Sequence, residues 1–170
     1  MSDRPGVIVG DTVHSVQGSM LAVGQEAPEF LLQRRDLEMR KLADYNDKIK
    51  IISCVPSVDT RVCQIQTKRF SNEVGLLDER IVLITVSADL PYALARFCVE
   101  EGVDNAEALS DHYTMQFADD YGVFDTDWRI CQRAVFVVDT ENIIRHVEYV
   151  AVIGDEPDYD AALAAVNSLL

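Results

Sequence analysis

The chain has 170 residues, of which 48% are hydrophobic, so it is long and apolar enough to build one domain with a proper core. Its formal net charge of −14 argues against nucleic-acid binding, because neutralising phosphates takes clustered lysine and arginine side chains. No stretch reaches the length of a membrane span, and the first residues lack the apolar core of a secretory signal. We therefore expect a single domain over residues 1–170, located in the cytoplasm, with neither nucleic acid nor membrane among its partners.

Short elements are predicted before the first core strand. Gly10-Asp11 lies between two β-favouring runs and is a two-residue turn signal. Pro28 opens a short apolar run, and the residues after that run are polar and charged. The expected elements are a β-hairpin over residues 7–16, a strand over 27–32 and a short helix over 37–45.

Strands and helices alternate in the middle of the chain. Residues 49–55 and 81–86 are nearly continuous apolar runs, which is typical of buried strands in a parallel sheet. After each run, apolar residues recur with helical spacing. The first of these helices carries Cys63 near its start, and the second opens at Asp89 or Leu90.

The last third of the chain predicts a further pair of strands and a final helix. Residues 103–113 show only a short apolar stretch and a loop. The remaining expected elements are a helix over residues 114–121, a β-hairpin formed by 134–138 and 143–150, and a terminal helix that opens at Asp158. Two strand–helix units followed by a hairpin and a helix indicate an α/β fold with a mixed sheet.

Cys63 falls just beyond a strand and near the start of a helix. Unpaired N–H groups and the helix dipole favour an anion at such a position, and the thiolate is the reactive form of cysteine. Thr60 can bring its hydroxyl to this thiolate or to a substrate. Pro56 has no N–H and a fixed φ, so it can shape the loop and shield the site from water. We expect Asp59 to cap the helix.

The other cysteines and the histidines give weaker signals. Cys54 lies in an apolar strand and is expected to be a small buried hydrophobe, and nothing assigns a task to Cys131. No Cys-x-x-Cys pair or zinc-ligand spacing occurs, and Asp125-Thr126-Asp127 lacks the other ligands of a calcium loop, so we expect no metal. Four cysteines are too few for a disulfide scaffold and suit a reducing compartment.

The stretch Pro56-Ser57-Val58-Asp59-Thr60-Arg61-Val62-Cys63 carries a family resemblance. Pro-x-x-x-Thr-x-x-Cys is similar to the active-site signature of the peroxiredoxins, and the fuller stretch resembles their thiol peroxidase branch, an atypical two-cysteine group. Further matches follow in the family's order: Gly24-x-x-Ala27-Pro28-x-Phe30, Ser87-Ala88-Asp89-Leu90-Pro91, Arg96-Phe97-Cys98, Arg133-Ala134 and Glu156-Pro157-Asp158-Tyr159. The resemblance implies a thioredoxin-like fold with a mixed central sheet flanked by helices and an N-terminal β-hairpin.

The same resemblance implies a function. Cys63 would attack hydrogen peroxide or an organic hydroperoxide and become a sulfenic acid, which Cys98 would resolve as a disulfide within the same chain. Arg133 would stabilise the developing charge, and no haem, flavin or metal would be needed. Thioredoxin or a similar dithiol would recycle the disulfide, and the protein would be a homodimer. The predicted catalytic residues are Cys63, Cys98, Thr60, Arg133 and Pro56.

A disulfide between Cys63 and Cys98 makes a structural demand. The two Cα atoms must come within about 7 Å, whereas two helices hold their cysteines farther apart in the reduced state. We therefore expect both helices to unwind locally during turnover.

Three other functions fit the same cysteines. The disulfide could switch partner binding in a peroxide-sensing protein, or the chain could be an interaction module on a thioredoxin-like scaffold in which the cysteines are incidental. General thiol–disulfide exchange is disfavoured because the second cysteine is remote in sequence.

Overall fold

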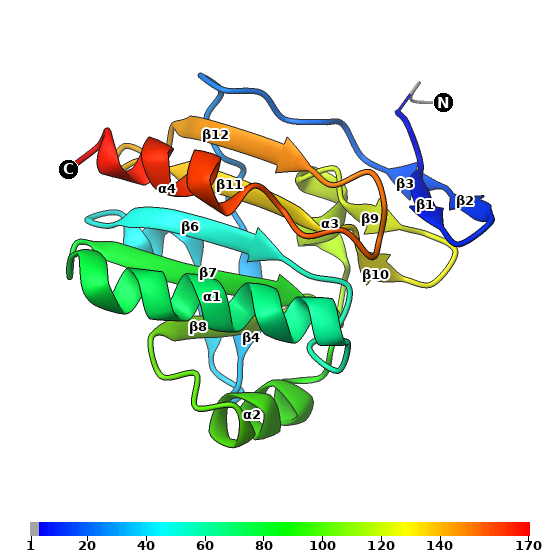
Figure 1. Cartoon of the computed structure of the whole chain (residues 1–170), viewed down its shortest axis with the longest axis horizontal. Coiled ribbons are helices and arrows are strands. Elements are labelled where there is room, and N and C mark those ends of the chain that lie inside the picture. The colour runs from blue at the N-terminus through cyan, green and yellow to red at the C-terminus, as the bar shows by residue number, and fades with distance from the viewer. Residues whose placement is uncertain (1–3) are drawn as a thin grey trace.

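The computed structural model describes residues 4–170, and its centre is a seven-stranded mixed sheet (Figure 1). The strands are β4 (Leu31–Arg34), β5 (Met39–Lys41), β6 (Ile49–Cys54), β7 (Ile81–Ser87), β8 (Ala106–Ser110), β11 (Ala134–Val138) and β12 (Ile144–Tyr149). Their order is β12-β11-β6-β7-β8-β4-β5. Strand β7 is parallel to both β6 and β8, and the other neighbours are antiparallel. This confirms the predicted α/β fold with a mixed central sheet.

Helices cover both faces of the sheet. They are α1 (Arg61–Leu77), α2 (Pro91–Glu100), α3 (Gln116–Asp120) and α4 (Tyr159–Asn167), with a 3-10 turn, η1 (Leu42–Tyr45). Figure 1 shows α1 and α4 on the same side of the sheet, where they pack on Ile51 and Val135. Ile52 and Phe136 point to the opposite face, which α3 covers through Phe117. Because side chains alternate along a strand, the odd-numbered residues of β6 and β11 face α1 and α4.

Two small sheets lie beside the central one. The predicted N-terminal hairpin is confirmed as β1 (Val7–Val9) and β2 (Thr12–His14), with Gly10 in the turn at a φ of +59°. A second small sheet, which sequence patterns did not predict, joins β3 (Val16–Gln17), β9 (Phe124–Asp125) and β10 (Ile130–Cys131).

The predicted core elements are confirmed with shifts of a few residues at their ends. Pro91 is the first residue of α2, where its missing N–H costs no helical bond. Asp158 caps α4, because its side chain accepts a hydrogen bond from the amide of Ala161 at 3.0 Å.

Three local predictions were wrong. Residues 27–30 form no strand, and β4 begins only at Leu31. The helix expected over residues 37–45 is instead strand β5 followed by η1, because residues 39–41 pair with β4. The loop expected within 103–113 contains β8, which is held between β7 and β4. In each case pairing across the sheet decided the local structure.

Within residues 4–170, none of the helices combines the length and the apolar character that crossing a membrane requires.

Candidate active site

The side chain of Cys63 is fully buried in the first turn of α1. Thr60 precedes the helix with an extended backbone (φ −97°, ψ 149°), and its carbonyl accepts a hydrogen bond from the amide of Gln64 at 3.0 Å. The amides of residues 61–63 come before this bond and have no acceptor within the helix. Their partial positive charge favours an anion at this end of the helix.

Asp89 fixes the loop that leads into α1. This half-buried residue follows β7, and its carboxylate accepts hydrogen bonds from the Ser57 hydroxyl (2.8 Å), the Val58 amide (2.8 Å) and the Ser87 hydroxyl (2.7 Å). A loop with such a charge-assisted anchor keeps a defined shape, and it holds the start of α1 in place.

The guanidinium of Arg133 reaches the sulfur of Cys63. Its Nη1 and Nη2 lie 3.5 and 3.6 Å from Cys63 Sγ. The same two nitrogens donate to Gln66 Oε1 at 2.8 Å and to the Ile153 carbonyl at 2.9 Å. Because the Arg133 side chain is only 1% exposed, its charge acts on the sulfur with little screening by water.

The sheet explains why these two residues meet. Across the β6–β11 pair, Val135 lies opposite Ser53, and both belong to the face that α1 covers. Arg133 immediately precedes β11 and has the same parity as Val135, so its side chain points to that face. Cys63 lies in the first turn of α1, the helix that follows β6. Because the end of β6 pairs with the start of β11, Cys63 and Arg133 lie close together.

Thr60 and Pro56 flank the cysteine in different ways. Pro56 is buried, as a shielding role requires. The Thr60 side chain is exposed, and its hydroxyl donates to the Ser57 carbonyl at 3.1 Å rather than to the sulfur. The prediction that Asp59 caps α1 was wrong, because its carboxylate pairs with Arg96 of α2 at 2.9 Å.

Cys98 shares a small hydrophobic cluster with Cys63. The cluster lies where α2 packs beside the start of α1 and consists of Val55, Val58, Cys63, Leu94, Phe97, Cys98, Val103 and Ala108. Both cysteines are free thiols. Burial raises the pKa of the Cys98 thiol, although the nearby Arg35 guanidinium opposes this effect, so Cys98 stays protonated at neutral pH.

Comparisons with known proteins agree with this geometry. Residues 23–147 match the sequence profile described as the AhpC/TSA family. The chain belongs to this family. A thiol peroxidase from Streptococcus pneumoniae is 48% identical over 155 residues, covering 91% of this chain and 94% of that protein. A thiol peroxidase from Streptococcus sanguinis is 47% identical over 152 residues, covering 89% and 93% of the two chains.

Solved structures confirm the fold of this peroxiredoxin. A peroxiredoxin-like protein from Aquifex aeolicus has a TM-score of 0.90 and 32% identity, and the match covers 98% of both chains. A thiol peroxidase from Chromobacterium violaceum has a TM-score of 0.87 and 25% identity, covering 98% of this chain and 97% of the other. The resemblance to the peroxiredoxins and their thiol peroxidase branch is thereby confirmed, as is the thioredoxin-like fold. The chain is an oxidoreductase of the peroxiredoxin type.

The two remaining cysteines of this peroxiredoxin lie on the opposite face of the sheet. Cys54 and Cys131 are both fully buried in the cluster that α3 covers, so Cys54 is the small buried hydrophobe that its strand predicted. Burial raises the pKa of both thiols well above the ordinary value. Neither presents a thiolate to an oxidant.

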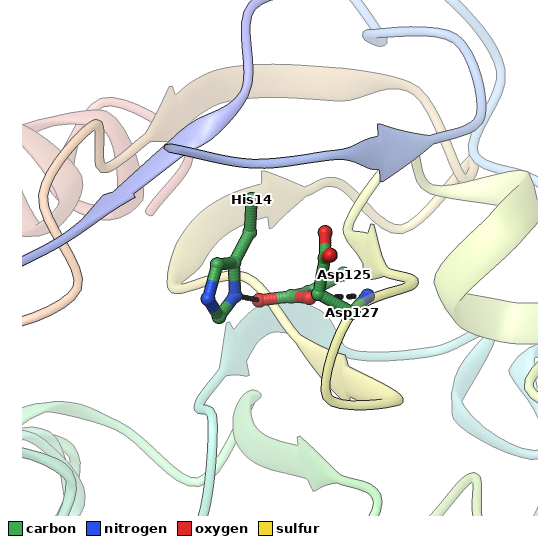
Figure 2. A group of neighbouring side chains, drawn as sticks. All are labelled: His14, Asp125 and Asp127. Atoms are coloured by element: carbon green, nitrogen blue, oxygen red, sulfur yellow. Dashed lines mark hydrogen bonds and ion pairs between the residues drawn. The ribbon is translucent and has the colours of Figure 1, made fainter. Parts of the chain in front are cut away.

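Residues 4–170 contain one group of side chains with the chemistry of a metal site, namely His14, Asp125 and Asp127 (Figure 2). Their ligand atoms lie within 4.8 Å of one another. His14 Nδ1 is 2.7 Å from one Asp125 oxygen, and the other oxygen accepts the amides of Asp127 and Trp128. Asp127 in turn accepts the amide of Ser15 at 2.7 Å. With these hydrogen bonds, the group clamps the N-terminal hairpin to the loop after β9.

The sequence patterns missed several supporting residues. Gln66 lies three residues after Cys63, a spacing that places it on the same side of α1. Asp89 belongs to a stretch that matched the family, but its role in anchoring the loop was not predicted. The carbonyl of Ile153 has no signature in the sequence, because a backbone group is the same in every residue.

Proposed function

We propose that this chain reduces hydrogen peroxide and organic hydroperoxides with Cys63 as the reacting cysteine. The observation that carries the proposal is the pair of buried Arg133 nitrogens, which lie 3.5 and 3.6 Å from Cys63 Sγ at the start of α1. The positive guanidinium and the helix terminus both favour the thiolate.

The first step oxidises Cys63. The thiolate attacks one oxygen of the peroxide, and an S–O bond forms while the O–O bond breaks. Two electrons pass from sulfur to the peroxide, and the departing oxygen leaves as hydroxide or alkoxide and takes up a proton. Arg133 supplies fixed donors to the charge that develops on oxygen. Thr60 lies three residues before Cys63, and its hydroxyl can turn toward the same oxygen. Pro56 shields the site from water.

The second step forms a disulfide with Cys98. The Cys98 sulfur attacks the Cys63 sulfenic acid, a water molecule leaves, and an S–S bond forms within the chain. The shared hydrophobic cluster of the two cysteines supports this pairing. Because both residues are buried in helices, the step requires local unwinding of α1 and α2.

The remaining parts of the proposal concern partners and location. The disulfide returns to two thiols with two electrons from thioredoxin or a similar dithiol. The thiol peroxidase relatives support the use of a thiol reductant. We further propose a homodimer of single-domain subunits in the cytoplasm, a reducing compartment that suits the four free cysteines.

A peroxidase assay with thioredoxin and its reductase tests the proposal. Cys63→Ser is expected to abolish turnover, because a hydroxyl is a far weaker nucleophile than a thiolate. Cys98→Ser should give one turnover and leave a sulfenic acid that a dimedone probe labels. Cys131→Ala is the matched control and should keep the wild-type rate.

The outcomes separate the alternatives. Activity that survives in Cys63→Ser contradicts the proposal. A wild-type protein that is oxidised once by peroxide but does not turn over with a dithiol would instead be a redox switch. Unchanged partner binding in Cys63→Ser, together with no oxidation of the wild type, would indicate an interaction module.

A further inference from the structure

Arg35 is a half-buried cation in the turn between β4 and β5. Its neighbour Arg34 pairs with the carboxylates of Asp36 and Glu107, at 3.4 and 3.1 Å. By contrast, no ion pair found within residues 4–170 includes Arg35. Because no carboxylate in this part of the chain offsets its charge, the guanidinium acts on the titratable groups beside it.

The pairing of β4 with β8 explains why Arg35 lies near Cys98. Arg34 is opposite Leu109, whose side chain belongs to the cluster that α3 covers. Since side chains alternate along a strand, the residue after Arg34 and the residue before Leu109 both face the other side of the sheet. That second residue, Ala108, shares the cluster of Cys98, and α2 packs on β8. The sheet therefore directs Arg35 toward the helix that carries Cys98.

Charges of both signs surround the Cys98 thiol. Burial is the main cause that raises its pKa, and the carboxylates of Asp104 and Glu107 raise it further. Among the charged groups that affect this pKa, Arg35 is the one that lowers it. From α1, the thiol of Cys63 lies in the same cluster. Arg35 thus supplies the positive charge that the Cys98 thiolate requires.

The resolving step needs this thiolate. It attacks the sulfur of the Cys63 sulfenic acid, and an S–S bond forms while the S–O bond breaks. The departing hydroxide takes up the proton that Cys98 released, so the product is water. When α2 opens, water relieves the cost of burying the thiolate. Arg35 stays with the β4–β5 hairpin, which the central sheet holds, and its long side chain can follow the sulfur.

We propose that Arg35 favours the Cys98 thiolate in the resolving step, as Arg133 favours the Cys63 thiolate in the attack on peroxide. This role rests on the proposed function, in which Cys98 resolves the sulfenic acid. It assigns the two steps to two different cations. Loss of Arg35 should therefore slow disulfide formation and leave sulfenic acid formation unchanged.

Arg35→Gln tests the charge. The reduced wild type and the variant are alkylated with iodoacetamide over a range of pH, and peptide mass spectrometry gives the rate at Cys98. In the variant, the curve of log rate against pH is expected to move about one unit to higher pH, so that the rate at neutral pH falls about ten-fold. Cys63 in the same samples should keep its wild-type curve, because Arg133 is intact.

The same variant separates the two steps of the reaction. After one equivalent of hydrogen peroxide, disulfide formation should be about ten-fold slower than in the wild type at neutral pH, whereas sulfenic acid formation should keep its rate. Rapid acid quenching and mass spectrometry of the intact protein follow both steps, since the reduced, sulfenic acid and disulfide forms differ in mass.

Two further variants serve as controls. Arg35→Lys keeps the positive charge and should stay within about three-fold of the wild type in both Cys98 alkylation and disulfide formation. Arg40→Gln removes the same charge from the same hairpin, but Arg40 pairs with Glu38 at 3.0 Å and lies opposite Leu32, on the face that α3 covers. It should keep the wild-type rates. Circular dichroism establishes that each variant is folded.

The proposal is overturned if folded Arg35→Gln alkylates and resolves at the wild-type rates. Equal losses in Arg35→Gln and Arg35→Lys would also overturn it, because the shape of the side chain rather than its charge would then matter. An equal loss in Arg40→Gln would do the same. Alkylation needs no peroxide, so the effect of Arg35 on Cys98 is tested even if the wild type lacks peroxidase activity. That separates the failure of this inference from the failure of the proposed function.

Discussion

Two cysteines of this chain lie on opposite faces of the central sheet and differ in their surroundings. Cys63 faces the buried guanidinium of Arg133, whereas Cys54 lies on the other face among apolar side chains. Cys63 lies only nine positions after Cys54, but the parity of β6 and the start of α1 place their sulfurs on opposite sides. The motif predicted the position of Cys63, and the apolar strand predicted the burial of Cys54.

Arg133 shows where residue patterns stop being informative. An arginine at the end of a strand is ordinarily a surface residue, and only the family resemblance marked this one. The structure buries it because Gln66, Ile153 and Cys63 accept from its guanidinium. Each of these partners is at least 20 residues from Arg133 in the sequence, so no local pattern could reveal that they meet it.

Lys50 gives a prediction for stability at the residue scale. Its side chain is buried in β6, where Nζ donates to the Tyr45 carbonyl at 3.1 Å and to Asn142 Oδ1 at 2.8 Å. Burial lowers the pKa of the Lys50 amine to about 8. An unfolded lysine has a pKa of about 10.4, so between these two values the unfolded chain holds a proton that the folded protein has released. The stability from this position is therefore complete above about pH 10.4 and is lost as the pH falls through about 8.

Urea unfolding of the wild type and Lys50→Met measures this effect. Relative to Lys50→Met, the free energy of unfolding of the wild type should increase by about 1–2 kcal/mol between about pH 7 and about pH 9.5. Other titrating groups are common to both proteins and cancel in the comparison. Parallel pH profiles for the two proteins would contradict this prediction, because they would mean that the pKa of Lys50 is the same in the folded and unfolded chains.

At the scale of elements, α1 and α2 are tied together at the site. The Asp59–Arg96 ion pair and the Asp89 carboxylate hold the loop before α1 close to α2, and the two cysteines share one cluster. Exposed ion pairs such as Asp59–Arg96 contribute little to stability, so breaking this one adds little to the cost of opening α2. This suits the proposed role of Cys98, in which the cysteine leaves its helix to react.

Hydrogen exchange tests whether these elements open. In the disulfide form, amides of residues 64–67 and 96–100 should exchange at least about ten-fold faster than in the reduced form, because forming the S–S bond breaks helical hydrogen bonds. Strand β11 and helix α4 serve as the internal control and should keep their protection. A disulfide form with unchanged protection in both segments would contradict the unwinding.

Elements with long apolar patterns could be predicted from the sequence, and short ones could not. Strands β6, β7 and β11 are rich in apolar residues, and α1 and α4 have clear helical spacing. By contrast, β8 reads Ala-Glu-Ala-Leu-Ser and has no β-branched residue, so it becomes a strand only by pairing with β7 and β4. The two-residue strands β3, β9 and β10 are too short to show any period.

At the scale of the molecule, the N-terminal hairpin supports the site from outside. Ile8 of β1 exchanges backbone hydrogen bonds with Ala151 and Ile153, at 2.8 and 3.0 Å. The carbonyl of the same Ile153 accepts from Arg133, so the hairpin braces the segment that holds the guanidinium. The hydrogen bond between His14 and Asp125 fastens the other strand of the hairpin to the end of β9 (Figure 2).

The central claim is that the fold makes one of four cysteines reactive. Brief treatment of the reduced Cys98→Ser protein with one equivalent of hydrogen peroxide and dimedone, followed by peptide mass spectrometry, tests it most directly. The account predicts that dimedone labels Cys63 and that Cys54 and Cys131 stay unmodified in the folded protein. Labelling of Cys54 or Cys131 while Cys63 remains a free thiol would contradict it.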